Sequence, residues 1–434
     1  MKKLIKKLLP SGLLHLYHFS LVAIAAVYYR FPAKQITVIG VTGTKGKTSV
    51  TEIISAILEE AGKKTAVAST LRFKQGDDSK RNLLKMTMPG RFFLQQFLKE
   101  AVNNHCDYAI IEMTSEGVKM FRHKFIYLDA LIFTGLTPEH IEAHGSYANY
   151  VAAKLQIAKA LEHSPKEKKI LVVNRESKEA DRFLETEVEK KLTFGGADGK
   201  PYTADEYGLE FSFADEVIKS HLIGEFNLYN LLAAATLAQA LGIGPKTIKQ
   251  AIEKFSGIPG RMQLIESDKP ALRAKQKFIV IVDYAHTPES LAQVYKTYHR
   301  RPKICVLGGT GGGRDKWKRE VMGSIADIHC DDIILTDEDP YDEDPLAIVA
   351  DIQRGIKNTP VTTIMNRRQA IAGALTVAVK IPDSVVLITG KGTDPYIMGP
   401  DGEKTPWSDA EVAGEELEKV LSKQQSEPPE IKTS

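Results

Sequence analysis

The sequence predicts an α/β protein with two domains, each built on a mostly parallel sheet, after a short apolar helix at the N-terminus. The chain has 434 residues, enough for about three domains of roughly 150 residues. Its 43% hydrophobic and 26% charged residues are ordinary for a globular protein and argue against a disordered, collagen-like or polytopic membrane protein. Apolar β-type runs alternate twice with helical patterns, which is typical of parallel sheets covered by helices.

Residues 1–35 form a basic and apolar segment that we expect to be helical. It contains six Lys and Arg residues and no acid, and the first carboxylate of the chain is Glu52. The apolar stretch Leu13–Tyr29 has 17 residues, which is at the short limit for crossing a bilayer. No small-residue cleavage site follows it, so we expect no export. Packing on the next domain and peripheral membrane contact through residues 1–30 both stay open, and a true span is the less expected alternative.

Residues 36–258 are expected to form the central domain. A less regular region extends to about Ser220, and a turn at Gly257–Gly260 ends the alternation. The predicted strands are 36–39, 108–111, 130–133 and 170–173, and the predicted helices are 49–61, 147–161 and 227–241.

Residues 259–421 are expected to form a second, Rossmann-like α/β domain. The tail 422–434 is rich in Glu, Pro and Lys, and we expect it to be disordered. The three cysteines of the whole chain, Cys106, Cys305 and Cys330, are odd in number and far apart in sequence. We therefore expect neither a disulfide scaffold nor a cysteine zinc site, which suits a reducing cytoplasm. The predicted strands of this domain are 278–282, 303–307, 332–335, 361–364 and 385–388.

The strongest chemical signal is a phosphate loop between a predicted strand and a predicted helix. In that context the backbone N–H groups cradle phosphates, Lys47 neutralises them, and Thr48 can hold Mg²⁺. Val41 stands where a strict Walker A sequence has its first glycine. The sequence therefore predicts a P-loop ATPase domain that uses ATP and Mg²⁺. The loop residues are Gly43, Thr44, Lys45, Gly46, Lys47, Thr48 and Ser49.

Two further polar residues follow predicted strands of the central domain. Glu112 ends the strand 108–111, and His140 lies in the loop after the strand 130–133. Functional groups gather beyond the carboxyl ends of parallel strands. Together with Thr48, these residues are candidates for holding a metal ion and nucleotide phosphates. Taken singly, a strand-end Glu or a loop His is more often an ordinary surface or hydrogen-bonding residue.

The chain resembles the Mur ligase family in five motifs that occur in the family's order. Within that family it is most similar to the MurE type, UDP-N-acetylmuramoyl-dipeptide:amino acid ligase. The resemblance extends from about Ile36 to about Gly414. The motifs are Val41–Thr48, Gly224–Asn230, Gly257–Met262, Asp283–Pro288 and Gly390–Gly392.

The resemblance implies a cytoplasmic, ATP-dependent amide ligase of peptidoglycan synthesis, and hence a role in the cell wall, cell shape and cell division. In such a ligase ATP phosphorylates a carboxylate, an amine attacks the acyl phosphate, and amide, ADP and phosphate result. Two domains can close on the intermediate, and cations can stabilise the transferring phosphoryl group.

The resemblance also implies roles for individual residues. Lys47, Glu112, His140 and Lys154 would be catalytic, and Lys154 would be carbamylated so that it supports a second Mg²⁺. Thr48, Glu112 and His140 would hold metal. The remaining nucleotide-binding residues would be Asn227 and Asn230 at the adenine, Arg261 and Asp283 from the hinge and second domain, and Lys391 at the γ-phosphate.

Two departures from the family bear on the substrates. A typical MurE carries an N-terminal domain that holds the UDP part of its substrate, whereas about 40 residues precede the phosphate loop here. A muramyl-peptide-like carboxylate that is lipid-linked or otherwise differently presented is therefore plausible, and a UDP-linked one stays open. We expect a monomer that binds no nucleic acid.

The second departure is the acidic stretch Thr336–Pro345, which has six acids and no base. In MurE enzymes that use diaminopimelate, the equivalent stretch reads Asp-Asn-Pro-Arg, and Tyr341 replaces that arginine here. Such a stretch would repel a second carboxylate and attract a second ammonium, so we predict a cationic amino acid such as lysine or ornithine. A solvated acidic loop is the alternative. The predicted pocket residues are Glu338, Asp339, Tyr341 and Asp394.

The glycine-rich segment Gly308–Lys316 fails the G-x-G-x-x-G spacing of a dinucleotide site. The resemblance places this loop near the acceptor and the amino acid, so Arg314 is a candidate for binding a substrate carboxylate, while an ordinary tight loop stays open. Other functions also remain: a folylpolyglutamate- or cyanophycin-like ligase of the same superfamily, or a MurT-like partner subunit. MurT-like chains carry a cysteine-rich zinc insertion, and this sequence has no paired cysteine motif.

Overall fold

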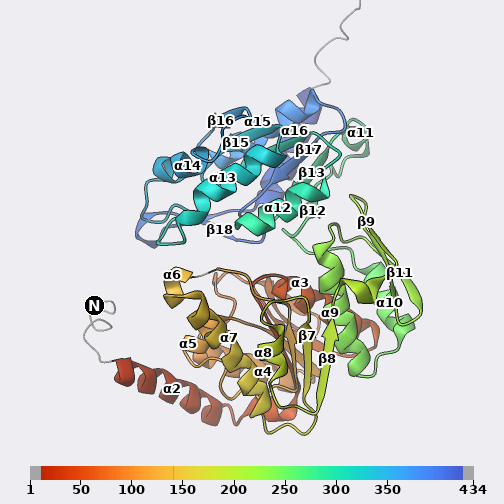
Figure 1. Ribbon diagram of the computed structural model, residues 1–434, viewed down its shortest axis with the longest axis vertical. Helices are drawn as coiled ribbons and strands as arrows, with labels where there is room; N and C mark the ends of the chain where they lie inside the picture. The colour runs from red at the N-terminus through yellow and green to blue at the C-terminus, as the bar shows by residue number, and fades with distance from the viewer. Residues whose placement is uncertain (1–10, 140, 424–434) are drawn as a thin grey trace, which may run out of the picture. The chain divides into compact units, whose positions relative to one another are not determined.

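The computed structural model describes residues 11–139 and 141–423 of the chain (Figure 1). Two compact α/β units are present. Unit 1 comprises Met1–Ala204, Gly208–His221 and Glu225–Ser256, and unit 2 comprises Asp205–Tyr207, Leu222–Gly224 and Gly257–Ser434. The main passage from unit 1 to unit 2 lies between Ser256 and Gly257, two residues before the predicted boundary. Each unit is described by itself.

Unit 1 is built on an eight-stranded sheet with the order β4-β3-β2-β5-β1-β6-β7-β8. Strands β2, β5, β1, β6, β7 and β8 are parallel, while β3 and β4 extend one edge in antiparallel pairing. The central strands are buried on both faces, which explains their continuous apolar sequences. The bounds are β1 (Thr37–Thr42), β2 (Thr65–Ala68), β3 (Arg72–Gln75), β4 (Asp78–Arg81), β5 (Tyr108–Met113), β6 (Ala130–Phe133), β7 (Ile170–Asn174) and β8 (Lys190–Phe194).

Helices cover both faces of this sheet. Apolar side chains of α4, α7 and α8 share one core cluster with strand residues such as Val38, Ile111 and Phe133. On the other face α3 contacts β2 and β5, and α9 contacts β7 and β8. The bounds are α3 (Lys47–Glu60), α4 (Arg91–Asn103), α5 (Ser115–Lys119), α6 (Ile141–His144), α7 (Tyr147–Glu162), α8 (Ala180–Leu184), α9 (Phe226–Ala240) and α10 (Pro245–Lys254).

The region that the sequence left irregular forms a small sheet of its own. After the short helix η2 (Gly196–Gly199), the strands β9 (Tyr202–Ala204), β10 (Leu209–Phe213) and β11 (Glu216–Ser220) pair in antiparallel order β11-β10-β9. Ala214 and Asp215 form the tight turn between β10 and β11 with φ of 48° and 65°. A two-residue hairpin usually has Asn-Gly or Asp-Gly at these positions, and the absence of that signal hid the hairpin.

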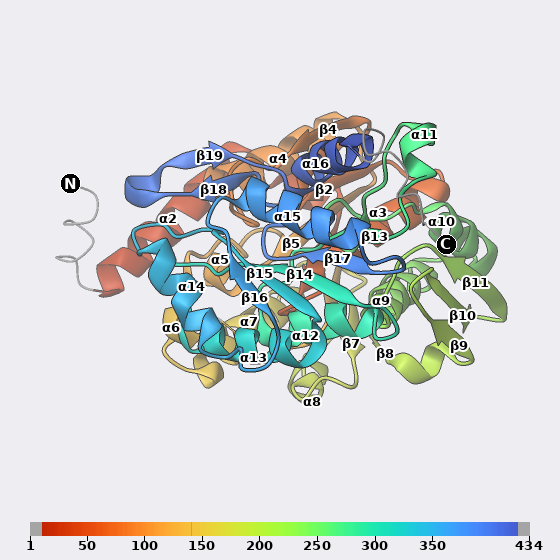
Figure 2. The ribbon, with the colours of Figure 1, turned by 90° about the horizontal axis from the view of Figure 1, so that it is seen from above.

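Unit 2 has a six-stranded sheet with the order β12-β13-β17-β14-β15-β16, in which only β12 is antiparallel to its neighbour. Figure 2 shows α15 and α16 on one side of this sheet and α12, α13 and α14 on the other. The strands are β12 (Gln263–Leu264), β13 (Ile279–Val282), β14 (Lys303–Leu307), β15 (Asp332–Leu335), β16 (Val361–Thr363) and β17 (Val385–Ile388), and a separate hairpin joins β18 (Tyr396–Met398) to β19 (Lys404–Pro406). The helices are α11 (Pro270–Arg273), α12 (Pro288–Thr297), α13 (Trp317–His329), α14 (Pro345–Gln353), α15 (Arg367–Val379), η3 (Pro400–Gly402) and α16 (Asp409–Lys423).

Two expectations for unit 2 need correction. Cys305 on β14 and Cys330 at the end of α13 form a disulfide, with Cα atoms 6.2 Å apart, although their separation of 25 residues argued against pairing. The return of the chain from α13 to the sheet brings them together, and Cys106 is free and buried. In the predicted disordered tail, Ser422 and Lys423 are the last residues of α16, and residues 424–434 lie outside the described residues.

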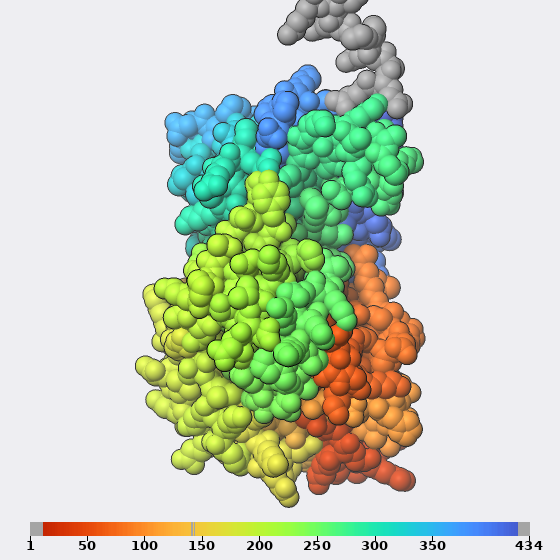
Figure 3. All heavy atoms as spheres, turned by 90° about the vertical axis from the view of Figure 1, so that its right-hand side faces the viewer, coloured from red at the N-terminus to blue at the C-terminus, as the bar shows by residue number. Residues whose placement is uncertain are grey.

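The N-terminal segment forms the helix α2 (Ser11–Tyr28) followed by the short helix η1 (Pro32–Gln35). The helix α2 contacts α4, and the space-filling view of Figure 3 shows red and orange residues from the first part of unit 1 side by side. His15 and Phe19 of α2 pack edge-on against Phe121, with ring centroids 5.9 and 5.8 Å apart. Within the described part of the chain, no helix is both long and apolar enough to cross a membrane.

His123 is buried beside this aromatic contact. Its ring stacks on Phe121 with centroids 6.5 Å apart, and neither ring nitrogen has a hydrogen-bond partner. Burial, with a smaller contribution from the charge of Lys124, lowers the pKa of His123 from 6.5 to about 4. A neutral imidazole therefore belongs to the folded state.

This pKa predicts a pH-dependent loss of stability. Since the unfolded histidine binds a proton below about pH 6.5 and the folded one only near pH 4, stability should fall as the pH drops through this interval, by up to about 3 kcal/mol. In urea unfolding at about pH 7 and about pH 4.5, His123→Leu should lose this share of the wild-type pH dependence. The exposed His163 supplies the control His163→Leu. An equal pH dependence in wild type and His123→Leu would contradict the assignment.

Candidate active site

The phosphate loop joins β1 to α3 with backbone conformations that need glycine. Gly43 and Gly46 have φ of 146° and 79°. A Cβ at Gly43 would lie 2.0 Å from Thr134 Oγ1, and one at Gly46 would lie 2.4 Å from Asn230 Oδ1. The loop is thus held between the end of β6 and the start of α9, and it leads into the N-terminus of α3, where free N–H groups favour anions.

The predicted phosphate-binding side chains lie at the start of α3. Lys47 donates from Nζ to the carbonyl oxygens of Gly43 and Thr44, at 3.0 and 2.8 Å, so its ammonium sits over the loop. Thr48 and Ser49 are buried in the first turn of the helix, while Lys45 is half-buried. This arrangement gives the loop both the positive charge and the N–H groups that a phosphate chain requires.

Side chains from α7 and from the end of β6 hold the loop in this shape. The hydroxyl groups of Thr44 and Tyr150 lie 2.9 Å apart, and burial raises the pKa of Tyr150. Thr134 at the end of β6 donates to the Lys45 carbonyl at 2.6 Å. These contacts fix the loop before any phosphate binds, so little ordering cost remains for binding.

Glu112 lies at the carboxyl end of β5, opposite Val41 of β1, and is fully buried. Its two carboxylate oxygens accept hydrogen bonds from the backbone N–H and the hydroxyl group of Thr70, both at 3.0 Å. Sequence reasoning found Glu112 and missed Thr70, because Thr70 lies in a loop without a motif. The hydrogen bonds orient the carboxylate and leave lone pairs for a cation.

Lys154 on α7 lies beneath the same loop and is 2% exposed. Its Nζ contacts the Gly43 carbonyl at 3.0 Å, the Thr42 hydroxyl at 3.3 Å and the Met113 carbonyl at 3.4 Å. Burial, followed by the charge of Lys47, lowers the pKa of Lys154 well below its ordinary value. A neutral amine is the form that reacts with CO₂, so this environment favours carbamylation, which remains a prediction.

The other predicted residues of unit 1 differ in position. Asn227 and Asn230 are buried at the start of α9, and Asn230 donates to Asn227 at 2.8 Å behind Gly46. Their predicted contact with adenine stays a prediction. His140 lies outside the described residues. Among the described residues, no group of three or more His, Cys, Asp or Glu side chains is placed to hold a metal ion.

In unit 2, Arg261 and Asp283 lie close together. Asp283 accepts hydrogen bonds from the backbone N–H groups of Met262 and Ala285, both at 2.7 Å. Burial raises the pKa of the Asp283 carboxyl, although the charge of Arg261 opposes that change. The Arg261 guanidinium stacks 4.3 Å over the ring of Tyr284. Arg261 Nε is buried without a hydrogen-bond partner, so this cation keeps a donor for a ligand.

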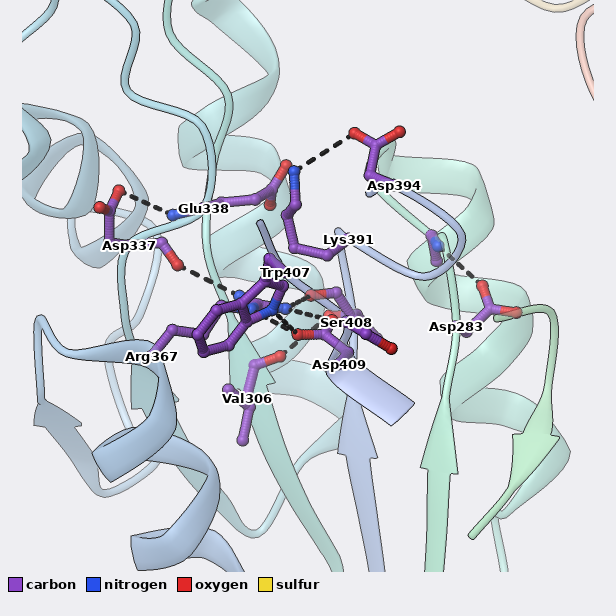
Figure 4. A network of polar contacts seen from close by, with 12 residues as sticks. Asp283, Val306, Asp337, Glu338, Arg367, Lys391, Asp394, Trp407, Ser408 and Asp409 are labelled. Atoms are coloured by element: carbon purple, nitrogen blue, oxygen red, sulfur yellow. Dashed lines mark hydrogen bonds and ion pairs between the residues drawn. The ribbon is translucent and has the colours of Figure 1, made fainter. Parts of the chain in front are cut away.

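The second group in unit 2 surrounds Lys391, which is fully buried (Figure 4). Lys391 Nζ lies 2.8 Å from Asp339 and 3.3 Å from Asp394. Glu338 accepts a hydrogen bond from Thr310 at 2.7 Å with one oxygen. Its other oxygen, Oε2, is buried without a partner, and a Cβ at Gly390 would lie only 2.3 Å from it. Two of the predicted pocket carboxylates, Asp339 and Asp394, thus share one ammonium, while Glu338 keeps an unpartnered oxygen.

A buried ion pair that the sequence did not reveal supports this group. Arg367 on α15 donates to both oxygens of Asp409 at 2.8 and 2.7 Å, and both side chains are essentially inaccessible. The same guanidinium donates to the carbonyl groups of Asp337 and Thr389. Arg367 therefore ties the acidic loop after β15 to the loop after β17, as Figure 4 shows. Trp407 completes the network by donating to Asp409 at 2.8 Å.

Tyr341 and Arg314 lie on neighbouring loops of unit 2. Tyr341 has φ of 52°, and its ring covers Gly312, where a Cβ would lie 2.9 Å from the ring. Arg314 is exposed, and its charge acts on Tyr284. The charge of Asp394 and burial together raise the pKa of Tyr284 well above its ordinary value.

Comparison with known proteins finds a family match in each unit. Residues 41–238 match the Mur ligase middle domain, and residues 260–392 match the Mur ligase, glutamate ligase domain. UDP-N-acetylmuramoyl-L-alanyl-D-glutamate--2,6-diaminopimelate ligase of Bacillus velezensis is 35% identical over 93% of this chain and 83% of its own length. The ligase of the same name from Syntrophomonas wolfei is 34% identical over 92% and 81%.

The chain belongs to the Mur ligase family. It is therefore an ATP-dependent ligase that joins an amino acid to a carboxylate. A solved structure titled as a UDP-N-acetylmuramoyl-L-alanyl-D-glutamate--2,6-diaminopimelate ligase superposes with a TM-score of 0.60 at 27% identity, covering 90% of this chain and 79% of that one. A folylpolyglutamate synthase of Mycobacterium tuberculosis has a TM-score of 0.68 at 15% identity, covering 86% and 92%, and shares the fold.

Two arginines of unit 1 of this Mur ligase were not found by sequence reasoning. Arg122, after α5, donates to the carbonyl of Met88 and to the sulfur of Met120, and Arg91 at the start of α4 contacts His18 of α2. Burial lowers the pKa of each guanidinium, and the charge of Arg91 lowers that of Arg122 further. Neither arginine forms an ion pair within residues 11–139 and 141–423, and each has a buried Nε without a partner. They form a cationic pair suited to an anionic ligand.

Carbamylation of Lys154 can be tested directly. In carbon-13 bicarbonate, the wild type should give a carbamate NMR signal that Lys154→Ala lacks, because the buried amine is neutral. Lys154→Ala should also lower kcat by roughly 10- to 100-fold. Lys159→Ala, at an exposed position on the same helix, is the matched control and should keep both the signal and the activity. A wild-type protein without the signal at full activity would contradict the prediction.

Proposed function

We propose that this Mur ligase is of the MurE type and adds a cationic amino acid, such as lysine or ornithine, to a muramyl-peptide-like carboxylate. The observation that carries the proposal is the buried, unpartnered oxygen of Glu338 beside Asp339 and Asp394. Similarity to diaminopimelate ligases over more than nine-tenths of the chain supports the MurE type. A role in peptidoglycan-like stem peptide synthesis in the cytoplasm follows from the same relatives.

The chemistry begins at the phosphate loop. The N–H groups of the loop and Lys47 hold the β- and γ-phosphates of ATP, and the acceptor carboxylate attacks the γ-phosphorus. The bond from this phosphorus to the bridging oxygen breaks, so that ADP leaves and an acyl phosphate remains. The neutral amine of the amino acid then attacks the acyl carbon, phosphate leaves with the former carboxylate oxygen, and the amine loses a proton.

The donor set around the loop fits Mg²⁺. The hydroxyl of Thr48 and the carboxylate of Glu112 are oxygen ligands, the type that this ion prefers, and carbamylated Lys154 would add a further carboxylate. Bound there, Mg²⁺ would neutralise charge on the phosphates. The chain's own contribution is to hold these oxygens in place through Thr70 and through the packed first turn of α3.

The acceptor carboxylate needs a cation, and Arg91 and Arg122 supply two. Their guanidinium groups are desolvated and keep unpartnered donors, so a carboxylate would form charge-assisted hydrogen bonds there. Thr87 links this segment to Glu112. Its hydroxyl lies 2.8 Å from the hydroxyl of Thr70, which in turn donates a hydrogen bond to Glu112. Arg314 remains a candidate for a second substrate carboxylate.

The charge balance of unit 2 favours a cationic amino acid. Asp339 and Asp394 already pair with the ammonium of Lys391, the buried Oε2 of Glu338 has no partner, and the nearby Arg367 is neutralised by Asp409. A second ammonium on the incoming amino acid would neutralise the remaining negative charge, whereas a second carboxylate on it would be repelled. Tyr341 covers Gly312 at the edge of this pocket and offers no cation for a distal carboxylate.

The function is tested by incubating the protein with ATP, Mg²⁺, muramyl-dipeptide acceptors in soluble and lipid-linked form, and single amino acids. Phosphate release and product mass should show an amide product with lysine or ornithine and much less with diaminopimelate. Release only with folate-like or other non-muramyl acceptors would assign the chain to another branch of the superfamily. If no acceptor of the panel gave phosphate release, a partner subunit would be favoured.

The pocket makes a specific prediction for amino acid selectivity. Norleucine has the shape of lysine without its ammonium, so Glu338→Gln and Asp394→Asn should lower the preference for lysine over norleucine by roughly 10- to 100-fold. The ratio of kcat/KM for the two amino acids measures this preference. Asp342→Asn changes an exposed carboxylate of the same acidic stretch and should leave the ratio unchanged. Unchanged selectivity in both pocket variants would refute the pocket.

A further inference from the structure

The helix α2 has an apolar outer face that no described residue of unit 1 covers. Six side chains of this face are more than half exposed: Leu13, Leu16, Tyr17, Ile24, Val27 and Tyr28, at 53, 61, 55, 55, 63 and 72%. At 100° per residue they fall within an arc of about 120°. Exposed apolar patches of this kind mark interaction sites, since a surface helix normally shows polar residues to water.

The opposite face of α2 is fully used in packing. His18, Val22, Ala25 and Ala26 are buried, and the helix contacts α4 and the aromatic ring of Phe121. The helix is therefore anchored to unit 1 in a fixed orientation. Its outer face points away from the unit, so the apolar side chains are presented outward together.

A second exposed apolar segment belongs to the part of unit 1 on which α2 packs. Leu83, Leu84 and Met86 in the loop before α4 and Phe92 in its first turn are 51, 45, 43 and 42% exposed. The contact between Arg91 and His18 joins this segment to α2. Two stretches that are far apart in sequence thus contribute apolar side chains to one region of unit 1.

Both stretches are basic and lack acids. Residues 1–35 carry Lys2, Lys3, Lys6, Lys7, Arg30 and Lys34, and no Asp or Glu occurs before Glu52. Residues 79–99 carry Lys80, Arg81, Lys85, Arg91 and Lys99, again without an acid. Apolar side chains flanked by tyrosines and basic residues are the composition of helices that lie in the interface of anionic membranes.

We propose that the outer face of α2, together with the loop 83–86, docks on an anionic lipid surface. The helix lies in the plane of the interface, since no described helix meets the requirements for a span. A second copy of the chain is a poor occupant, because pairing two such faces would bring two acid-free basic segments together. Anionic lipid headgroups complement that charge.

Docking would also place the acceptor site at the lipid surface, a consequence that rests on the proposed function. Arg91 contacts α2 directly and lies beside Arg122. Docking through α2 would hold a carboxylate on a lipid-anchored molecule in the neighbourhood of these guanidinium groups. The acceptor class favoured by this geometry is therefore a membrane-presented anion.

The test is co-sedimentation of the full chain with vesicles. The protein should pellet with vesicles of equal parts phosphatidylglycerol and phosphatidylcholine, and roughly 10-fold less with phosphatidylcholine alone. The double variant Leu16→Glu/Ile24→Glu changes two exposed positions and should weaken binding to the anionic vesicles by roughly 10- to 100-fold. Val217→Glu, at an exposed apolar position on β11, is the matched control and should bind as the wild type does.

Several outcomes would overturn the proposal: no pelleting with anionic vesicles, equal pelleting with both vesicle types, or wild-type binding by the double variant. Sedimentation velocity would identify a second copy as the occupant if the wild type self-associates and the double variant does not. Thermal unfolding confirms that each variant is folded. Ligase activity on a soluble acceptor is measured separately, so that a failure of docking is distinguished from a failure of the proposed function.

Discussion

The burial of the Lys154 amine under the phosphate loop is the constraint on which the active site of unit 1 depends. Two strand ends and the loop surround one nitrogen, which contacts Thr42, Met113 and Gly43. An ammonium there would be poorly solvated, so the site favours the neutral amine. The chemistry of the loop therefore depends on the packing of α7, because the amine of Lys154 is neutral only where water is excluded.

The central strands could be predicted from sequence because each is buried on both faces and reads as a continuous apolar run. The edge strands and the small sheet could not be predicted in this way. β4 is fully exposed and polar, with the sequence Asp-Ser-Lys-Arg, and β10 and β11 turn at Ala214 and Asp215 without a glycine signal. The pairing of Cys305 with Cys330 depends on the return of the chain from α13, which spacing alone does not reveal.

Site residues that lie in a sequence motif could be predicted, whereas residues that join the site only through tertiary contacts could not. Glu112 and Lys391 stand in recognisable sequences, but their partners Thr70 and Asp339 are fixed by strand order and loop contacts. Arg122 does not lie in a motif, and only the structure shows that its buried Nε has no hydrogen-bond partner. Arg367 and Asp409 are 42 residues apart, and only the fold reveals that they hold the acidic loop in place.

In the proposed mechanism, phosphorylation at the loop that Lys154 supports activates the acceptor carboxylate. An acceptor with oxygen-18 in its carboxylate tests this directly, with the muramyl dipeptide that gives product and with mass spectrometry of the released phosphate. With both carboxylate oxygens labelled, one labelled oxygen should pass from the carboxylate to the phosphate in each turnover. Amide formation with unlabelled phosphate would contradict it, because the carboxylate would then have been activated in another way.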